Sequence, residues 1–287
     1  MSTRPEADVL YTSDLHGHEP LYREALDVAR HYRVRAIILG GDLAPHADPP
    51  EQAKFYRSFL LPLFREYFAE PGSADVTYIF GNDDWKTSGD LLLTAGLERL
   101  HDAHGRILPF LDGTHLAGLA SVPITPFGMK DWDRWEEGLS PQARMDGVRS
   151  APGGRLAPFD FRGREQEESL ARELQAIEAA IPTGARLICV FHGPPHGTAC
   201  DQVAPGAHVG SREVRAFLER VQPALSLHGH IHESPRISGK FADHVGRTIC
   251  VNPGQRMGSA LHAVTFRLRD VTGTLTHTLL GRVESSA

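Results

Sequence analysis

Late in the chain stands Leu227-His228-Gly229-His230-Ile231-His232-Glu233, a stretch with three histidines at alternate positions. It follows the apolar run 223–227. Alternate side chains of an extended strand lie on the same face, and the glycine permits a tight turn. We therefore expect a buried strand that ends here and directs two or three imidazoles into one small volume. Because imidazole is the commonest metal ligand, a metal site is the first hypothesis. A histidine-rich surface loop is the alternative.

The composition favours a cytoplasmic protein with a sizeable core. The 287 residues are 41% hydrophobic and carry a net charge of −6. The lack of a basic excess argues against binding to polymeric nucleic acid, which depends on neutralising phosphates. The three cysteines are far apart, which indicates a reducing compartment. We see no signal peptide and no apolar run of about 18 residues, so we expect no membrane span.

The first hundred residues alternate between strand and helix patterns. Apolar runs at 8–12, 36–39 and 76–80 predict strands, and helical spacing follows at 19–32, 51–70 and 89–100. The second helix contains Pro62, where we expect a bend or a break. This alternation is typical of βαβ units in a parallel sheet.

The second half repeats the theme after an irregular segment. We expect a strand at 114–119, an insertion over one edge of the domain at about 121–164, and a helix at 165–181. A strand at 186–191 and a helix from the N-cap Ser211 to Gln222 come next. The tail has β-type runs at 248–251, 263–268 and 274–279, of which the last two predict a hairpin. The sequence therefore predicts one domain over 1–287 with one insertion.

Polar side chains that bind metals follow each of the predicted buried strands. They are Asp14, His16, Asp42, Asn82, His192, His230 and His232. Because the carboxyl ends of strands in an open α/β sheet form the ligand crevice, we expect them to meet. Carboxylate, amide and imidazole donors suit Mn, Fe, Zn or Co. Seven donors exceed the need of one tetrahedral ion and match two divalent ions that share a carboxylate. Glycines precede three of the donors and allow close approach of the backbone.

Five short blocks in order resemble those of the calcineurin-like metallophosphoesterase superfamily. They are Asp14-Leu15-His16, Gly41-Asp42, Gly81-Asn82-Asp83-Asp84, His192-Gly193 and Gly229-His230-Ile231-His232. The resemblance implies a four-layer α/β/β/α sandwich around a dinuclear metal centre, with manganese favoured. It also implies that Asp42 bridges the two ions and that a bridging water or hydroxide is the nucleophile.

The resemblance divides the remaining donors between the two ions. Asp14, His16 and His232 would hold one of them. Asn82 would hold the other with His192 and His230, and Asn82 is also expected to contact the substrate.

Asp83 departs from the commonest form of the third block, which has a histidine at this position. An ionised Asp83 would repel a phosphate. A protonated Asp83, with a pKa raised by burial or by a nearby carboxylate, could act as a general acid. The alternative is that Asp83 only orders its loop. The departure favours cleavage of diesters or phosphoanhydrides over monoesters.

Further residues are weaker candidates. His18 and His196, which lies in the loop after His192, could contact the substrate. His196 could also have a catalytic role. The alternative for both is a surface position or a position that orients the metal ligands. We expect His228 to be structural. Trp132 and Trp135 either stack on a nucleotide base or anchor the insertion.

We therefore predict a metal-dependent phosphoesterase that hydrolyses phosphodiester or phosphoanhydride bonds of a small phosphorylated substrate, of which a nucleotide is one candidate. One alternative is a scaffold protein with little or no activity, although the full set of donors argues against it. The other is a nuclease, which would need a basic groove; the six arginines of the insertion are interspersed with acidic residues. The sequence contains no indication of the oligomeric state.

Overall fold

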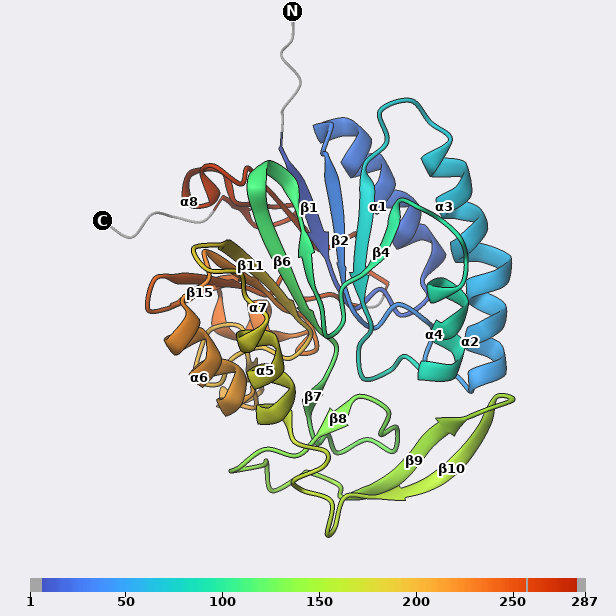
Figure 1. Ribbon diagram of the computed structural model, residues 1–287. Coiled ribbons are helices and arrows are strands. Elements are labelled where there is room, and N and C mark those ends of the chain that lie inside the picture. Colours follow the sequence, from blue (N-terminus) through green and yellow to red (C-terminus); the bar gives the residue numbers. More distant parts are fainter. Residues whose placement is uncertain (1–6, 257, 283–287) are drawn as a thin grey trace, which may run out of the picture.

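Two β-sheets face each other at the centre of the computed structural model, which describes residues 7–256 and 258–282 (Figure 1). One sheet has seven strands, in the order β19 (Gly281–Arg282), β18 (Thr276–His277), β17 (Ala263–Phe266), β1 (Val9–Thr12), β2 (Ala36–Gly40), β3 (Asp75–Ile79) and β4 (Leu100–Asp102). The other has six, in the order β15 (Ala242–Val245), β16 (Thr248–Val251), β14 (Leu225–Leu227), β11 (Arg186–Phe191), β6 (Thr114–Leu119) and β5 (Ile107–Pro109).

The central strands of both sheets are parallel, as the sequence pattern predicts. β1 to β4 run parallel in the first sheet. β6, β11, β14 and β16 run parallel in the second. β17 and β18, which correspond to the two strands of the predicted hairpin, are antiparallel. The carboxyl ends of the parallel strands therefore lie at one end of the molecule, the lower end in Figure 1.

Helices cover the outer face of each sheet. The first is covered by α1 (Glu19–Tyr32), α2 (Pro49–Phe55), the π-helical turn η1 (Tyr56–Leu60), α3 (Leu61–Phe68) and α4 (Lys86–Leu93). The second is covered by α5 (Leu170–Ala179) and α6 (Arg212–Val221). The remaining short elements are η2 (Leu111–Gly113), β12 (Gln202–Val203), β13 (Ala207–His208), α7 (Ser234–Ser238) and α8 (Val271–Thr274). The predicted four-layer α/β/β/α sandwich is confirmed.

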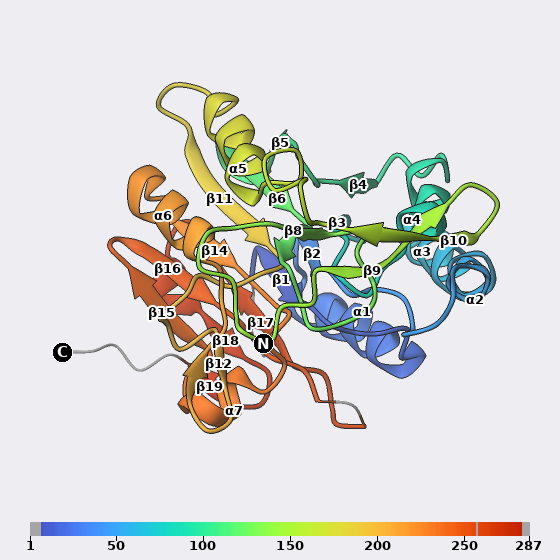
Figure 2. The same ribbon diagram turned by 90° about the horizontal axis from the view of Figure 1, so that it is seen from below.

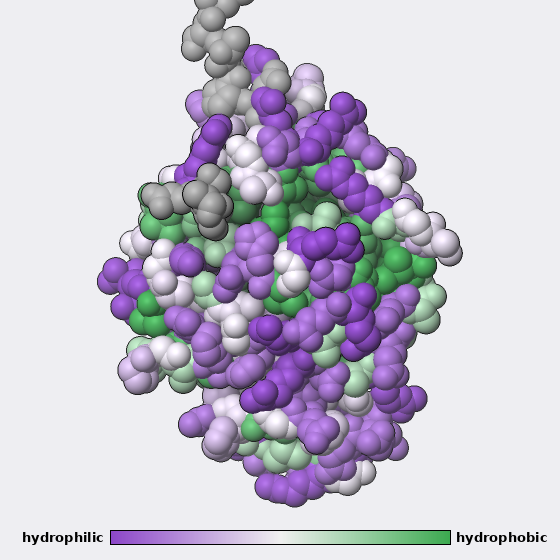
Figure 3. Space-filling model, turned by 90° about the vertical axis from the view of Figure 1, so that its left-hand side faces the viewer, coloured by the Kyte–Doolittle hydropathy of each residue, from purple (hydrophilic) through white to green (hydrophobic). Residues whose placement is uncertain are grey.

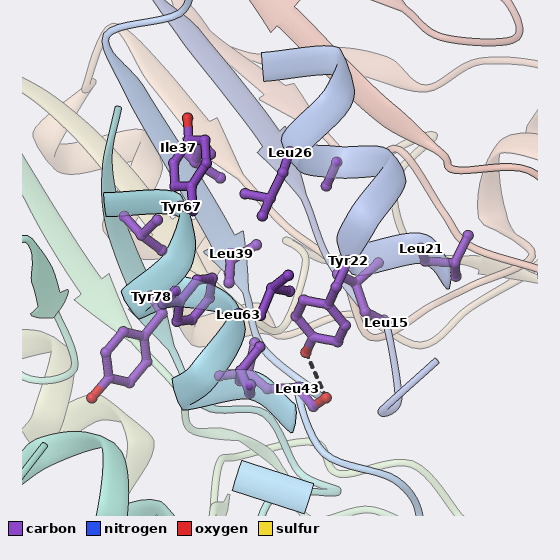
Figure 4. Close-up of a cluster of buried hydrophobic side chains, with 14 of the residues drawn as sticks. Leu15, Leu21, Tyr22, Leu26, Ile37, Leu39, Leu43, Leu63, Tyr67 and Tyr78 are labelled. Carbon is purple, nitrogen blue, oxygen red and sulfur yellow. Dashed lines mark hydrogen bonds between the residues drawn. The ribbon is translucent and has the colours of Figure 1, made fainter. Parts of the chain in front are cut away.

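The apolar side chains form three buried clusters that correspond to these layers. One lies between the first sheet and α1 to α4, one between the two sheets, and one between the second sheet and its helices. In the first cluster the hydroxyl of Tyr22 on α1 donates to the carbonyl of Leu43 at 2.6 Å, which ties the helix to the loop after β2 (Figure 4). Hydrophilic residues predominate on the surface in Figure 3, with hydrophobic residues in smaller areas between them.

Several predicted helices and strands have different bounds in the structure. The helix predicted at 89–100 is α4, which runs from Lys86 to Leu93, and Leu100 already belongs to β4. Gly96, with a φ of 66°, lies in the turn between them. The helix predicted at 165–181 begins only at Leu170. The strand predicted at 274–279 is shortened because residues 271–274 form α8.

The bend predicted at Pro62 is a π-helical turn. Between α2 and α3 the chain winds through η1, which ends two residues before Pro62. Proline has no N–H to donate within a helix, and π-turns are one way in which a helix accommodates such a residue. In the described parts of the chain, no helix has both the length and the apolar character to cross a bilayer.

The segment 121–164 lies across the carboxyl ends of the sheets rather than only over one edge (Figure 2). It contains β7 (Val122–Pro123), β8 (Asp133–Arg134) and a hairpin of β9 (Asp146–Ala151) and β10 (Arg155–Asp160). The residue pattern has no clear period here because neither strand of the hairpin has a buried face: β9 is mostly half-buried and β10 mostly exposed, so neither needs apolar alternation.

Trp132 anchors this segment to the core. Its ring stacks on Phe80 with the centroids 5.5 Å apart, and its indole N–H donates to the carbonyl of Asp84 at 2.6 Å. The Lys86 ammonium lies 4.5 Å from the ring centroid. The side chain is buried. This arrangement supports the anchoring role rather than stacking on a base.

We expect the Trp132→Ala substitution to lower the free energy of unfolding by about 3–5 kcal/mol, because it leaves a large cavity and an unpaired carbonyl. Chemical denaturation measures the change. Trp132→Phe keeps the stacking on Phe80 and loses only the hydrogen bond, so its cost should be smaller. A loss below about 1 kcal/mol for the alanine variant would contradict the anchoring role.

Candidate metal centre

All seven predicted donors converge at the carboxyl ends of the strands. β1 leads into Asp14 and His16, β2 into Asp42, β3 into Asn82, β11 into His192, and β14 into His230 and His232. Because β1, β2 and β3 are neighbours in one sheet and β11 and β14 in the other, the donors come from both sheets. The site therefore lies where the two sheets meet at the lower end of the molecule in Figure 1.

Four of the donors form a first group. Asp14, His16, Asp42 and His232 each offer one atom, and these atoms all lie within 4.8 Å of one another. The Nε2 atoms of His16 and His232 are 3.2 Å apart, and His232 Nε2 lies 3.3 Å from Asp14 Oδ1. Two imidazole nitrogens and two carboxylates thus point into one small volume.

The other donors form a second group that shares Asp42 with the first. His192 Nε2 lies 3.2 Å from Asn82 Oδ1 and 3.4 Å from Asp42 Oδ2. The ring of His230 lies 5.3 Å from that of His192, centroid to centroid. Asp42 is therefore placed between the groups, because its Oδ2 also lies 3.6 Å from His16 Nε2.

Four of the seven donors have left-handed backbone conformations. The φ angles are 60° for Asp14, 42° for His16, 51° for Asp42 and 64° for His230. Such a conformation costs a non-glycine residue about 1–3 kcal/mol. It persists only where the surrounding structure imposes it, and strain of this kind concentrates at functional sites. The surrounding structure therefore maintains the geometry of this site against the backbone preference of the residues themselves.

Charges within the cluster determine its protonation. Burial alone would lower the pKa of His192, but the charges of Asp42 and Asp14 outweigh it and raise the pKa to about 10. The same balance, with Asp14 as the main partner, raises the pKa of His232 to about 9. Burial opposes the ionisation of Asp14 and Asp42, yet the neighbouring histidines hold the pKa of both carboxyls below its usual range.

This charge distribution fits divalent cations. Without a metal, two buried carboxylates are neutralised by protons on His192 and His232. Metal ligands must be deprotonated, so a bound cation would replace these protons with its own charge. The mixture of carboxylate, amide and imidazole donors also suits borderline divalent ions. The residues present therefore fit the dinuclear centre that the sequence predicts.

Surrounding residues orient the donors. His192 Nδ1 donates to the carbonyl of Gly40 at 2.8 Å, which directs Nε2 into the cluster. The Asn252 side-chain amide donates to the carbonyls of Gly229 and Ile231, at 3.2 and 3.1 Å, and so fixes the backbone on both sides of His230.

Two neighbours of the donors have structural contacts. His228 Nδ1 contacts the carbonyls of Phe191 and Gly193, in keeping with the structural role expected for it. The buried carboxylate of Asp84 accepts from the backbone N–H groups of Leu43 and Ala44, and so connects the turn after β3 to the loop after β2. Burial and then the charge of Asp42 raise the pKa of Asp84 to about 7.

Asp83 lies at the edge of the cluster. Its N–H donates to Asp42 Oδ1 at 2.8 Å, and its Oδ1 accepts from Asn82 Nδ2 at 3.1 Å. Its Oδ2 lies 3.6 Å from His16 Nδ1 and 3.0 Å from His46 Nδ1. Burial and then the charge of Asp42 raise the pKa of its carboxyl. His46 is not among the residues expected from the sequence.

The two histidines predicted to contact the substrate, His18 and His196, have surroundings that differ from those of the donors. His196 lies beside a different acidic residue, with Nδ1 3.8 Å from Asp201 Oδ2, and its ring is 5.9 Å from that of His208. His18 precedes α1, and its Nδ1 is buried without a hydrogen-bond partner in the described part of the chain. Their roles toward a substrate stay predictions.

A cavity of about 450 Å³ borders the cluster. Its lining residues are His232, Glu233, Pro235, Arg236, Gln255, Arg256 and His262. The guanidinium groups of Arg236 and Arg256 form no ion pair or side-chain hydrogen bond with any residue of 7–256 or 258–282, and both residues are exposed. No sequence pattern singles out these two arginines, because only the fold brings them to the cavity.

Comparison with known proteins identifies the family. The sequence model described as calcineurin-like phosphoesterase matches residues 7–234. The chain therefore belongs to the calcineurin-like phosphoesterase family, as the order of its five blocks predicts. Comparison with curated proteins found no significant match.

Solved structures share the fold at low sequence identity. The TT1561 protein of Thermus thermophilus is 18% identical with a TM-score of 0.57, and the match covers 96% of this chain and 99% of that one. A dimetal phosphatase from Danio rerio is 15% identical with a TM-score of 0.55, covering 92% and 94%. A phosphopantetheinyl hydrolase from Mycobacterium tuberculosis is 15% identical with a TM-score of 0.52, covering 88% and 91%.

Proposed function

We propose that this protein is a metal-dependent phosphohydrolase that cleaves phosphodiester or phosphoanhydride bonds of a small anionic substrate. The observation that carries the proposal is the convergence of seven donors into two groups that share Asp42. Asp14, His16 and His232 would hold one divalent transition ion, and Asn82, His192 and His230 the other, with Asp42 between them. Of the candidate metals Mn, Fe, Zn and Co we favour manganese.

The metals would supply the electrostatic part of the reaction. A pair of bound ions lowers the pKa of water and stabilises both the attacking and the leaving oxygen of a phosphoryl group. The protein would contribute the fixed geometry of the donors and their orientation by Gly40 and Asn252. The dimetal phosphatase and the phosphopantetheinyl hydrolase with the same fold support this class of reaction.

The cavity beside His232 supports a substrate with more than one anionic or polar part. A site of about 450 Å³ lies within the range of small-molecule pockets. Arg236 and Arg256 are exposed there without a described carboxylate partner, so they are available to bind a second phosphate or another anion. This favours a diester or anhydride, of which a nucleotide is one candidate, over a simple monoester.

A small substrate in the cytoplasm is part of the same proposal. Cys189, Cys200 and Cys250 are buried free thiols, which agrees with a reducing compartment. The chain has no basic excess for a polymeric nucleic acid, since its net charge is −6.

Two measurements on the purified protein test the proposed function. Elemental analysis should find about two transition-metal ions per chain. With manganese added, bis-p-nitrophenyl phosphate should be hydrolysed faster than p-nitrophenyl phosphate. A folded protein that binds no metal and hydrolyses neither ester would indicate a scaffold, and faster hydrolysis of the monoester would refute the diester preference.

A further inference from the structure

The loop between β2 and α2 brings a histidine to the edge of the candidate metal centre. His46 Nδ1 lies 3.0 Å from Asp83 Oδ2, and the same oxygen lies 3.6 Å from His16 Nδ1. One carboxylate therefore separates the ring of His46 from a ring of the donor cluster. His46 is not one of the seven donors, and its side chain is 71% exposed.

This loop is fixed on both sides of His46. The Gln52 side-chain amide donates to the carbonyl of Pro45 at 3.0 Å, and also to the carbonyl of Asp83. The indole N–H of Trp85 donates to the carbonyl of Ala47 at 2.8 Å. The two residues that flank His46 are thus bound to groups from α2 and from the turn after β3. Its position beside Asp83 is a consequence of the fold and not of one flexible side chain.

The ring of His46 has one occupied and one open nitrogen. Nδ1 contacts the Asp83 carboxylate, whereas Nε2 has no hydrogen-bond partner among the described residues. A carboxylate that contacts one imidazole nitrogen orients the ring.

Asp83 itself is less suited to donate a proton. Its Oδ1 accepts from the Asn82 amide and its Oδ2 contacts His46, so both oxygens are already occupied by neighbouring side chains. Its side chain is only 15% exposed. The Nε2 atom of the exposed His46 ring, by contrast, has no partner among the described residues.

We propose that His46 is the general acid of the hydrolysis and that Asp83 is a positioning residue that orients its ring. This inference rests on the proposed phosphoesterase function. Water releases a proton to solvent, and the resulting hydroxide adds to phosphorus. The bond between phosphorus and the leaving oxygen breaks, and the electron pair of that bond stays on the leaving oxygen. The proton on His46 Nε2 passes to the leaving oxygen and forms the alcohol. The exposed ring then takes up a proton from solvent.

A series of aryl methyl phosphates tests this role. Protonation matters little when the leaving group is p-nitrophenolate and much when it is unsubstituted phenolate. General acids contribute about 10²–10⁴-fold. We therefore expect His46→Gln to lower kcat about 100-fold or more for the phenyl ester and only a few-fold for the p-nitrophenyl ester. The dependence of log kcat on the basicity of the leaving group becomes steeper in the variant.

His244→Gln is the matched control for this test. His244 is also exposed and lies on β15, so His244→Gln should reproduce the wild-type series. An equal loss for every ester, or a change in KM alone, would overturn the acid role and leave a binding role. A wild-type protein that hydrolyses none of the esters would refute the proposed function itself.

A measurement without metal or substrate tests the pair directly. In the metal-free protein, comparison with His46→Gln assigns the Cε1–H proton signal of His46. Asp83→Asn removes the charge beside the ring, so this signal should shift at constant pH while the signal of His244 stays in place. An unchanged His46 signal would overturn the pairing with Asp83, whatever the activity of the enzyme.

Discussion

Asp42→Asn is expected to abolish the binding of at least one of the two metal ions and to lower kcat/KM by more than about 100-fold. Substitutions of residues that only orient a metal ligand cost about 10–100-fold, and Asp42 is the donor shared by both groups. Asparagine keeps the size of the side chain. In the wild-type protein the Asp83 N–H donates to Asp42 Oδ1 at 2.8 Å, and the carbonyl oxygen of asparagine can still accept this hydrogen bond. The fold should therefore survive while the charge shared by the two groups of donors is lost.

Asp102→Asn is the control for this substitution. Asp102 is also largely buried, with a side chain 11% exposed, and accepts from the backbone N–H of His104 at 3.1 Å. It lies on β4, the edge strand beside β3, opposite Tyr78, and it is not one of the seven donors. Its variant should keep both ions and full activity. Two ions per chain and near-normal kcat/KM in Asp42→Asn would show that Asp42 does not bridge a metal pair.

The fold could be predicted from the sequence because its central strands are apolar and its connections are regular. The bounds of α1, β6 and β11 agree with the residue patterns. The convergence of the donors followed from one rule, that parallel strands present their carboxyl ends at the same edge. Each donor comes within a few residues of the end of such a strand, so its position needed no knowledge of the loops.

The parts that could not be predicted depend on the paths of loops. His46 and Asp83 are 37 residues apart, and their contact requires both the pairing of β2 with β3 and the hydrogen bonds of Gln52. The cavity beside His232 combines residues of α7 with a loop beyond β16. The left-handed backbone of His230 is likewise imposed by tertiary contacts, because its sequence alone disfavours that conformation.

Gly229→Ala should reduce activity about 100-fold although it changes no donor. A Cβ atom at this position would collide with Ser13 Oγ and with Asp14 Oδ2. Asp14 is fully buried, and its carboxylate accepts from the His230 N–H at 3.0 Å, so it has little freedom to move aside. Either the carboxylate or the loop that carries His230 must shift. A displacement of about 1 Å in such a site can cost about 10²-fold in rate.

Gly128→Ala separates this crowding from the general effect of replacing a glycine. Neither Gly128 nor Gly229 has a left-handed φ, so alanine does not strain the backbone at either position. At Gly128 the nearest heavy atom to an added Cβ is Arg144 Nη1 at 4.0 Å, which leaves room for the methyl group. Steady-state kinetics and elemental analysis should show a wild-type protein for Gly128→Ala and a loss of both metal and activity for Gly229→Ala. Equal activity of the two variants would mean that the close approach of the backbone to Asp14 does not matter. In that case the geometry of the donors would be less constrained than the left-handed residues of the site indicate.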